Sequence, residues 1–114
     1  MGYLTDEITE AAIYTRPKQS GIDLVGHWGI VVSNKSGRFL VHNMPKTGTV
    51  ATPASDMSSK WKVDRQLEVK QNKTIHGMFK STGLAAYLPQ GLLKYLTQGL
   101  CTGSTMDMAG YLSK

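Results

Sequence analysis

The order of apolar and polar residues along the chain predicts strands first and helices last. We expect strands at 11–15, 26–32, 39–43, 48–51 and 61–70, the last of them half-exposed because its apolar and polar residues alternate. Leucines then recur at helical spacing over 84–100, where a proline and a glycine interrupt them, and a terminal helix is expected over 104–112. This order predicts one α+β domain over residues 1–114, with a small antiparallel sheet packed on C-terminal helices.

The second and third strands form a predicted hairpin that brings two histidines together. Its bulky apolar residues are Trp28, Ile30, Val32, Phe39 and Val41. Side chains alternate across a strand, so gathering this set on one face restricts the register. The most compact solution pairs Val32 with Gly37 across a four-residue loop. It also places His27 directly opposite His42 on the other face, with β-carbons about 5 Å apart.

Three readings of the two imidazoles remain open. They could ligate a metal, although familiar zinc sites need a third protein ligand, for which Cys101 is the candidate. They could be two partly exposed histidines without a chemical role. In the third reading they form an acid–base pair, in which one imidazole moves a proton and the other fixes its ring and tautomer. The acid–base reading predicts His27 and His42 as catalytic residues, with no metal and no cofactor.

A base of this kind needs a nucleophile, and Cys101 meets the requirement better than any serine. It is the only cysteine, which excludes an internal disulfide and leaves a buried apolar role or a functional thiol. The residues that follow it, 102–105, favour the start of a helix. Backbone amides at a helix N-terminus stabilise a thiolate, and the same amides can hold a developing oxyanion.

Charge and composition indicate which partners and which cellular compartment to expect. The chain of 114 residues carries 13 Lys and Arg against 8 Asp and Glu, a formal charge of +5 that favours anionic partners or simply gives a basic surface. A loose basic region surrounds Trp61 and consists of Lys60, Lys62, Arg65, Lys70, Lys73 and Lys80. We read His76 as a histidine of a loop or a helix start. No signal peptide or transmembrane stretch is visible, so we expect a protein of the cytoplasm or one delivered into a host cytosol.

These residues together resemble a known family. A strand that opens His-Trp-Gly-Ile-Val-Val at His27, a second strand that ends near His42, and a cysteine on a later helix are similar to the circularly permuted NlpC/P60 papain-like proteins. The nearest branch contains lecithin:retinol acyltransferase and the H-Ras-like phospholipase/acyltransferases. The resemblance implies a permuted papain-like fold, Cys101 as nucleophile, His27 as general base and acid, His42 as the orienting residue, and a thioester intermediate. The Asn-Cys-Glu-His-Phe signature of that branch is absent, because residues 100–104 read Leu-Cys-Thr-Gly-Ser.

Two functions follow as hypotheses. The first is a thiol-dependent hydrolase or acyltransferase that acts on an ester or amide bond, with phospholipid and peptide substrates both open and peripheral membrane contact as one consequence. The second is a non-catalytic binding module on the same fold, which docks an anionic partner (a lipid head group, nucleic acid or an acidic protein) through the basic strand. For the first hypothesis we expect no nucleic-acid partner. The oligomeric state stays open.

Overall fold

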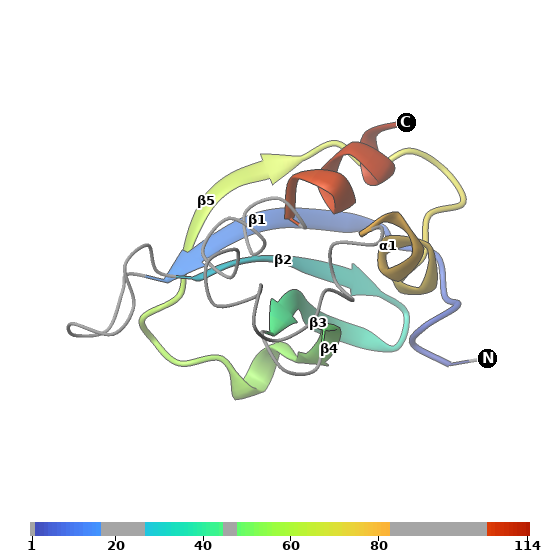
Figure 1. The fold of residues 1–114 in the computed structure, drawn as a ribbon. Helices are drawn as coiled ribbons and strands as arrows, with labels where there is room; N and C mark the ends of the chain where they lie inside the picture. Colours follow the sequence, from blue (N-terminus) through green and yellow to red (C-terminus); the bar gives the residue numbers. More distant parts are fainter. Residues whose placement is uncertain (1, 17–26, 45–47, 83–104) are drawn as a thin grey trace.

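A five-stranded antiparallel sheet organises the described part of the chain (Figure 1). The computed structural model describes residues 2–16, 27–44, 48–82 and 105–114. The strands are β1 (Glu10–Arg16), β2 (His27–Asn34), β3 (Gly37–Met44), β4 (Gly48–Pro53) and β5 (Lys62–Leu67), in the spatial order β4-β3-β2-β1-β5. A short 3-10 helix, η2 (Ala54–Asp56), follows β4, α1 spans Ile75–Ser81, and residues 105–113 form a terminal helix. The predicted α+β class and terminal helix are confirmed, whereas the helical stretch predicted over 84–100 lies outside the described residues.

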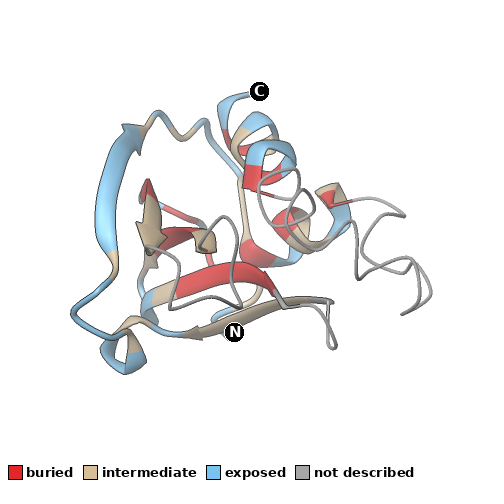
Figure 2. Cartoon of the chain, turned by 60° about the vertical axis from the view of Figure 1, so that its left-hand side comes forward, coloured by how far each residue is buried: buried red, intermediate tan, exposed pale blue. Residues whose placement is uncertain are grey.

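One face of the sheet carries the hydrophobic core, and we call it the inner face. Its strands contribute Ile13, Ile30, Val32 and Val41, each at most 1% exposed. Ile75 and Met78 of α1 and Met108 and Leu112 of the terminal helix, all 0% exposed, join the same cluster. In Figure 2 the buried segments of both helices turn toward the buried strands. Two helices therefore cover the inner face, and the alternate residues of each strand point to the opposite, outer face.

The two helices are joined through Tyr111. Its hydroxyl accepts a hydrogen bond from the backbone nitrogen of Thr74 at 3.1 Å, and the Thr74 side chain caps α1 by accepting one from Gly77 N at 3.0 Å. His76 is the second residue of α1 and is exposed, in agreement with its predicted place at a helix start. Among the described helices, none has the length and apolar character that crossing a membrane requires.

The hairpin of β2 and β3 forms, but its predicted register is wrong by two residues. Ile30 pairs with Val41 instead of Phe39, and Asn34 pairs with Gly37, which leaves a two-residue loop. Both registers place the apolar set on one face, so the pattern cannot separate them. The residues of the turn favour the observed register. The side chain of Asn34 accepts a hydrogen bond from Ser36 N at 2.9 Å, and Gly37 adopts φ +135°, which a residue with a side chain rarely takes.

The predicted half-exposed strand over 61–70 is also only partly right. Its ladder with β1 contains a bulge between Ile13 and Tyr14. Leu67 pairs with Ala11 and packs against the core, but after the bulge Val63 pairs with Tyr14 and is 52% exposed. A bulge inserts one extra residue and so reverses the faces beyond it. The alternation in the sequence therefore does not produce one continuous buried stripe on β5.

Candidate functional site

The two histidines come to the outer face at neighbouring strand ends. His27 opens β2 and pairs with Arg16, the last residue of β1, while His42 lies on β3 opposite Val50 of β4. The prediction that the imidazoles share the outer face is supported by the cavity that both of them line. Their direct pairing is wrong, since the register shifts by two residues and leaves His27 diagonal to His42.

Gly29 makes room for His42. A β-carbon built on Gly29 would lie 3.1 Å from Cβ of His42 and 2.7 Å from Cδ1 of Leu40. Real β-carbons do not approach a neighbour at the second distance, so a side chain here would push Leu40 or the imidazole away. The Gly-Ile-Val-Val pattern of β2 therefore combines an apolar inner side with a gap on the outer side that accommodates the ring.

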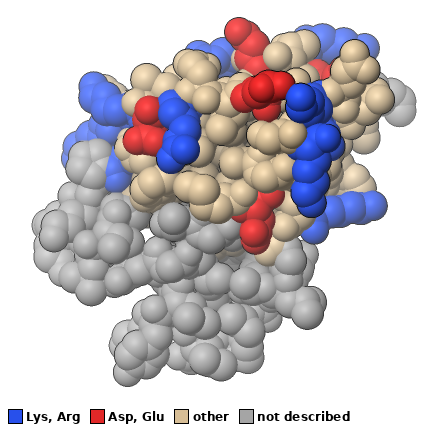
Figure 3. Space-filling model, turned by 90° about the horizontal axis from the view of Figure 1, so that it is seen from above, with Lys and Arg blue, Asp and Glu red and all other residues tan. Residues whose placement is uncertain are grey.

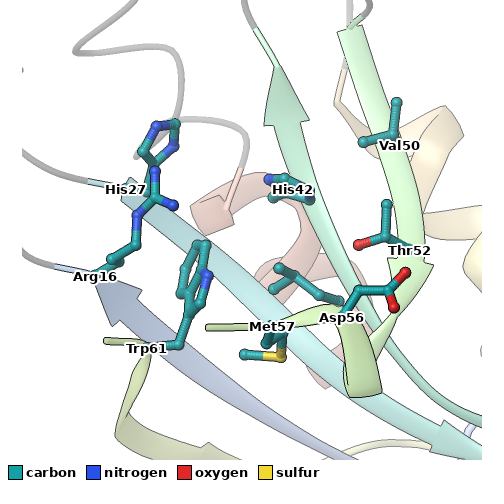
Figure 4. A pocket seen from close by; sticks show the side chains of 9 residues that line it. Arg16, His27, His42, Val50, Thr52, Asp56, Met57 and Trp61 are labelled. Atoms are coloured by element: carbon teal, nitrogen blue, oxygen red, sulfur yellow. The ribbon is translucent and has the colours of Figure 1, made fainter. Parts of the chain in front are cut away.

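A cavity of about 450 Å³ opens beside the histidines (Figure 4). Its walls are Arg16, His27, Leu40, His42, Val50, Thr52, Asp56, Met57 and Trp61. The volume is in the range of small-molecule sites, and the mixture of apolar walls with a few polar groups is typical of them.

Trp61 forms the wall that faces both imidazoles. Its ring centroid lies 6.3 Å from that of His27 and 6.2 Å from that of His42, the latter in an edge-to-face arrangement. The guanidinium carbon of Arg16 sits 5.3 Å from the centroid of the same ring, within cation–π range. A turn after η2 places the indole there, because Trp61 N donates to Ser58 O at 3.3 Å. Four side chains from three strands and a loop thus form one cluster.

His42 is held neutral at physiological pH. Burial lowers the pKa of His42 from 6.5 to about 4, and the neighbouring charges of His27 and Arg16 lower it in the same direction. The residue is 9% exposed, and among the described residues no group hydrogen-bonds its buried Nδ1. A neutral imidazole can donate from one ring nitrogen and accept at the other. His42 therefore offers a ligand or a second catalytic group a hydrogen bond without carrying a charge.

Two charged side chains stand on opposite sides of the cavity. Figure 4 shows Arg16 beside His27 on one side and Asp56 beside Thr52 on the other. Within the described ranges neither has an ion-pair partner, and the buried Nε of Arg16 has no hydrogen-bond acceptor. The half-buried guanidinium of Arg16 therefore carries a desolvation cost without a compensating ion pair, whereas the exposed carboxylate of Asp56 is solvated.

The third predicted catalytic residue, Cys101, lies outside the described residues. The helix that follows it packs through Met108 and Leu112 on the inner face, whereas His27 and His42 are on the outer face. The hypothesis of a metal site also needs Cys101, because that residue was the candidate for the third ligand. In the described ranges no three His, Cys, Asp or Glu side chains gather in a group that could hold a metal ion.

Sequence reasoning missed three cavity residues, namely Arg16, Asp56 and Trp61. Strand parity could have found Arg16, because it ends β1 and pairs with His27 on one face. Trp61 was assigned to the basic strand, but it precedes β5 and turns toward the imidazoles. Asp56 comes from a short 3-10 helix that no periodicity marks.

The predicted basic region does not form one positive patch on the face shown in Figure 3, where acidic and basic side chains lie side by side. Lys70 Nζ contacts Glu68 Oε1 at 2.8 Å, and Arg65 Nε contacts Asp64 Oδ2 at 3.4 Å. Lys73 lies over the ring of Tyr111, 4.6 Å from its centroid. Three of the six basic residues are thus occupied by local partners, which weakens this strand as a docking surface for an anion.

Comparison with known proteins gives one similarity. No family model and no solved structure matches the chain. The chain is similar to "Uncharacterized protein R800" of Acanthamoeba polyphaga mimivirus, with 29% identity over 117 residues and 100% of both chains covered. The name of this viral protein states no activity, so the proposed function rests on the residues of the site.

Proposed function

We propose that the protein is a thiol-dependent hydrolase or acyltransferase that acts on an ester or amide bond through Cys101, His27 and His42. The observation that carries the proposal is the shared cavity, which both imidazoles line beside Trp61. Its volume can admit an acyl group, and its apolar walls exclude bulk water from one side of that group. The antiparallel sheet and the two-histidine hairpin support the permuted papain-like fold in this proposal. The viral origin of the similar protein supports an action in a host cytosol.

The proposed chemistry follows from the ordinary roles of these groups. His27 takes the proton of the Cys101 thiol, and the thiolate attacks the carbonyl carbon of the substrate. The bond to the leaving oxygen or nitrogen breaks, the leaving group takes the proton from His27, and a thioester remains on Cys101. Water or an acceptor alcohol or amine, deprotonated by His27, then releases the acyl group and regenerates the thiol. His42, neutral near pH 7, orients the reacting imidazole or the substrate by a hydrogen bond.

The single cysteine makes this proposal directly testable, because iodoacetamide then reports on Cys101 alone. At pH 7 we expect alkylation to be faster than in the urea-unfolded chain, and His27→Ala to slow it by more than tenfold, as the loss of a base should. His76→Ala, a change at an exposed histidine of α1, is the matched control and should leave the rate unchanged. Equal rates in the folded and unfolded chain would remove Cys101 as the nucleophile.

A second candidate is non-catalytic binding of an anionic partner in the same cavity. The observation in its favour is the packing of the helix after Cys101 on the inner face, away from the imidazoles. In this candidate the anion binds at Arg16, whose guanidinium lies over the Trp61 ring, and not at the basic strand. Binding that is unchanged in Cys101→Ala but lost in Arg16→Gln would favour it over the enzyme.

A further inference from the structure

Among the described residues that line the cavity beside the histidines, two carry opposite charges that no other described side chain neutralises. Arg16 contributes a positive charge on one side and Asp56 a negative charge on the other (Figure 4). The ion pairs between described residues involve other side chains, and neither of these two side chains has a hydrogen bond to a described residue. The cavity also has apolar walls, which include Leu40, Val50 and Met57.

The geometry points to a ligand with an anionic group at one end, a cationic group at the other and an apolar segment between them. An ω-amino acid, or an amino-acid or peptide fragment of that shape, has this chemistry. The inference rests on the proposed function in one respect, since it takes the cavity as the substrate site. The binding itself needs neither Cys101 nor a chemical step.

The side of the cavity that would bind the anionic group of the ligand is the one formed by Arg16, and we expect it to bind more strongly than the side formed by Asp56. The guanidinium of Arg16 lies over the Trp61 ring within cation–π range, and the edge of a guanidinium carries its hydrogen-bond donors. A carboxylate or phosphate that reaches the terminal nitrogens at this edge would receive charge-assisted hydrogen bonds. The neutral His42 can add a hydrogen bond without charge repulsion toward either end.

Asp56 would bind the cationic group of the ligand. Its carboxylate belongs to η2 and lines the cavity near Thr52, whose hydroxyl can also accept from an ammonium group. Asp56 is exposed, so its attraction for a cation is screened by water and is weaker than that of Arg16 for an anion. A purely anionic ligand would leave this carboxylate as a nearby repulsive charge, which favours a ligand with two opposite ends.

Three sets of probes of matched length test this inference on the full chain. The ω-amino acids 4-aminobutyrate, 6-aminohexanoate and 8-aminooctanoate are compared with the corresponding carboxylates and alkylamines. Binding is followed by the ring-proton signals of the 3 histidines, of which His27 and His42 line the cavity and His76 does not. We expect at least one ω-amino acid to shift the signals of His27 and His42 but not His76, with at least about fivefold higher affinity than its carboxylate or amine.

Two variants test separately the binding of the anionic and the cationic group of the ligand. Arg16→Gln should weaken the ω-amino acid and the carboxylate by about tenfold and leave the amine unchanged, while Asp56→Asn should weaken the ω-amino acid and the amine by about threefold and leave the carboxylate unchanged. Arg65→Gln and Asp64→Asn, which remove a charged pair that does not line the cavity, are the controls and should have no effect.

The outcomes are distinct from those of the alkylation experiment. A carboxylate that binds as tightly as the ω-amino acid of its length would overturn the two-ended ligand and leave an anion site. The absence of shifts at His27 and His42 for every probe would overturn the site itself. If either of these two results were found together with rapid alkylation of Cys101, the proposed thiol-dependent enzyme would stand and the proposed class of substrate would be rejected. Asp56 is exposed, so Asp56→Asn should fold and remain informative even where Arg16→Gln does not.

Discussion

The two faces of the sheet are built by the same strands, and they differ in the polar and charged side chains that they carry. On the inner face Ile13, Ile30 and Val41 are at most 1% exposed and lie under two helices. On the outer face Arg16, His27 and His42 border a cavity. Neighbouring residues such as His42 and Val41 therefore face entirely different surroundings. Period-two alternation produces both faces at once, so one strand can carry the core on one side and a candidate site on the other.

The two faces also differ in what a substitution is expected to change, namely the folding free energy on the inner face and the properties of the cavity on the outer face. The inner face is apolar and closely packed, so a change of volume there acts directly on the folding free energy. The outer face contains polar atoms, such as Nδ1 of His42, that have no partner among the described residues. Asn43 Nδ2, on the same side of β3 as Val41, also lacks a partner among the described residues, so such an atom indicates a functional site only beside the cavity, as at His42.

The largest effect should come from Gly77→Ala at the junction of the two helices that cover the inner face. A β-carbon on Gly77 would overlap the hydroxyl and ring of Tyr111, which is held in place by its hydrogen bond with Thr74 N. We expect a loss of about 3 kcal/mol in the free energy of unfolding, measured by urea denaturation, because Tyr111 or α1 must move.

Gly110→Ala is the matched control for that change. Gly110 lies in the terminal helix, and a β-carbon there meets nothing within 4 Å. Alanine is the better helix former, so this variant should gain about 0.5–1 kcal/mol. Equal effects of the two substitutions would contradict the packing of Tyr111 against α1.

A smaller effect, on the outer face, is a dependence of stability on pH through His42. Its pKa is about 4 in the folded protein and 6.5 when unperturbed. Between these values the unfolded chain binds more protons, so stability is full above about pH 6.5 and falls as the pH drops toward 4. We expect a loss of about 2 kcal/mol over this window, reduced from the full linkage value because the site is partly solvated.

Denaturation at several pH values with His42→Phe checks this expectation. The variant should show a flatter profile between pH 6.5 and 4, since the group that takes up the proton on unfolding is gone. His76→Gln, at an exposed position on α1, should keep the profile of the original protein. A steep profile that survives in His42→Phe would assign the pH dependence to other groups.

The sequence predicts the two faces better than it predicts the site. Parity alone places Ile30, Val32 and Val41 together and His27 with His42, because it needs only the period of a strand. It cannot choose between registers that differ by two residues, and it cannot foresee the bulge that turns Val63 outward. Trp61 and Asp56 reach the cavity from a loop and a 3-10 helix, where tertiary packing and not periodicity sets the direction of a side chain.

The smallest effect concerns the two-residue turn between β2 and β3. Gly37→Ala places a side chain at φ +135°, and Asn34→Ala removes the hydrogen bond from Ser36 N, so each should cost about 1 kcal/mol. If the turn alone selects the register, the double variant should populate the hairpin slipped by two residues, in which Ile30 faces Phe39 and His27 faces His42. We expect instead that cross-strand NOEs between Val32 and Phe39 persist, because β3 is also paired with β4 from Phe39 to Met44 and cannot slide alone. The diagonal placement of the two imidazoles is then a property of the whole sheet, and the turn contributes stability without deciding the geometry of the cavity.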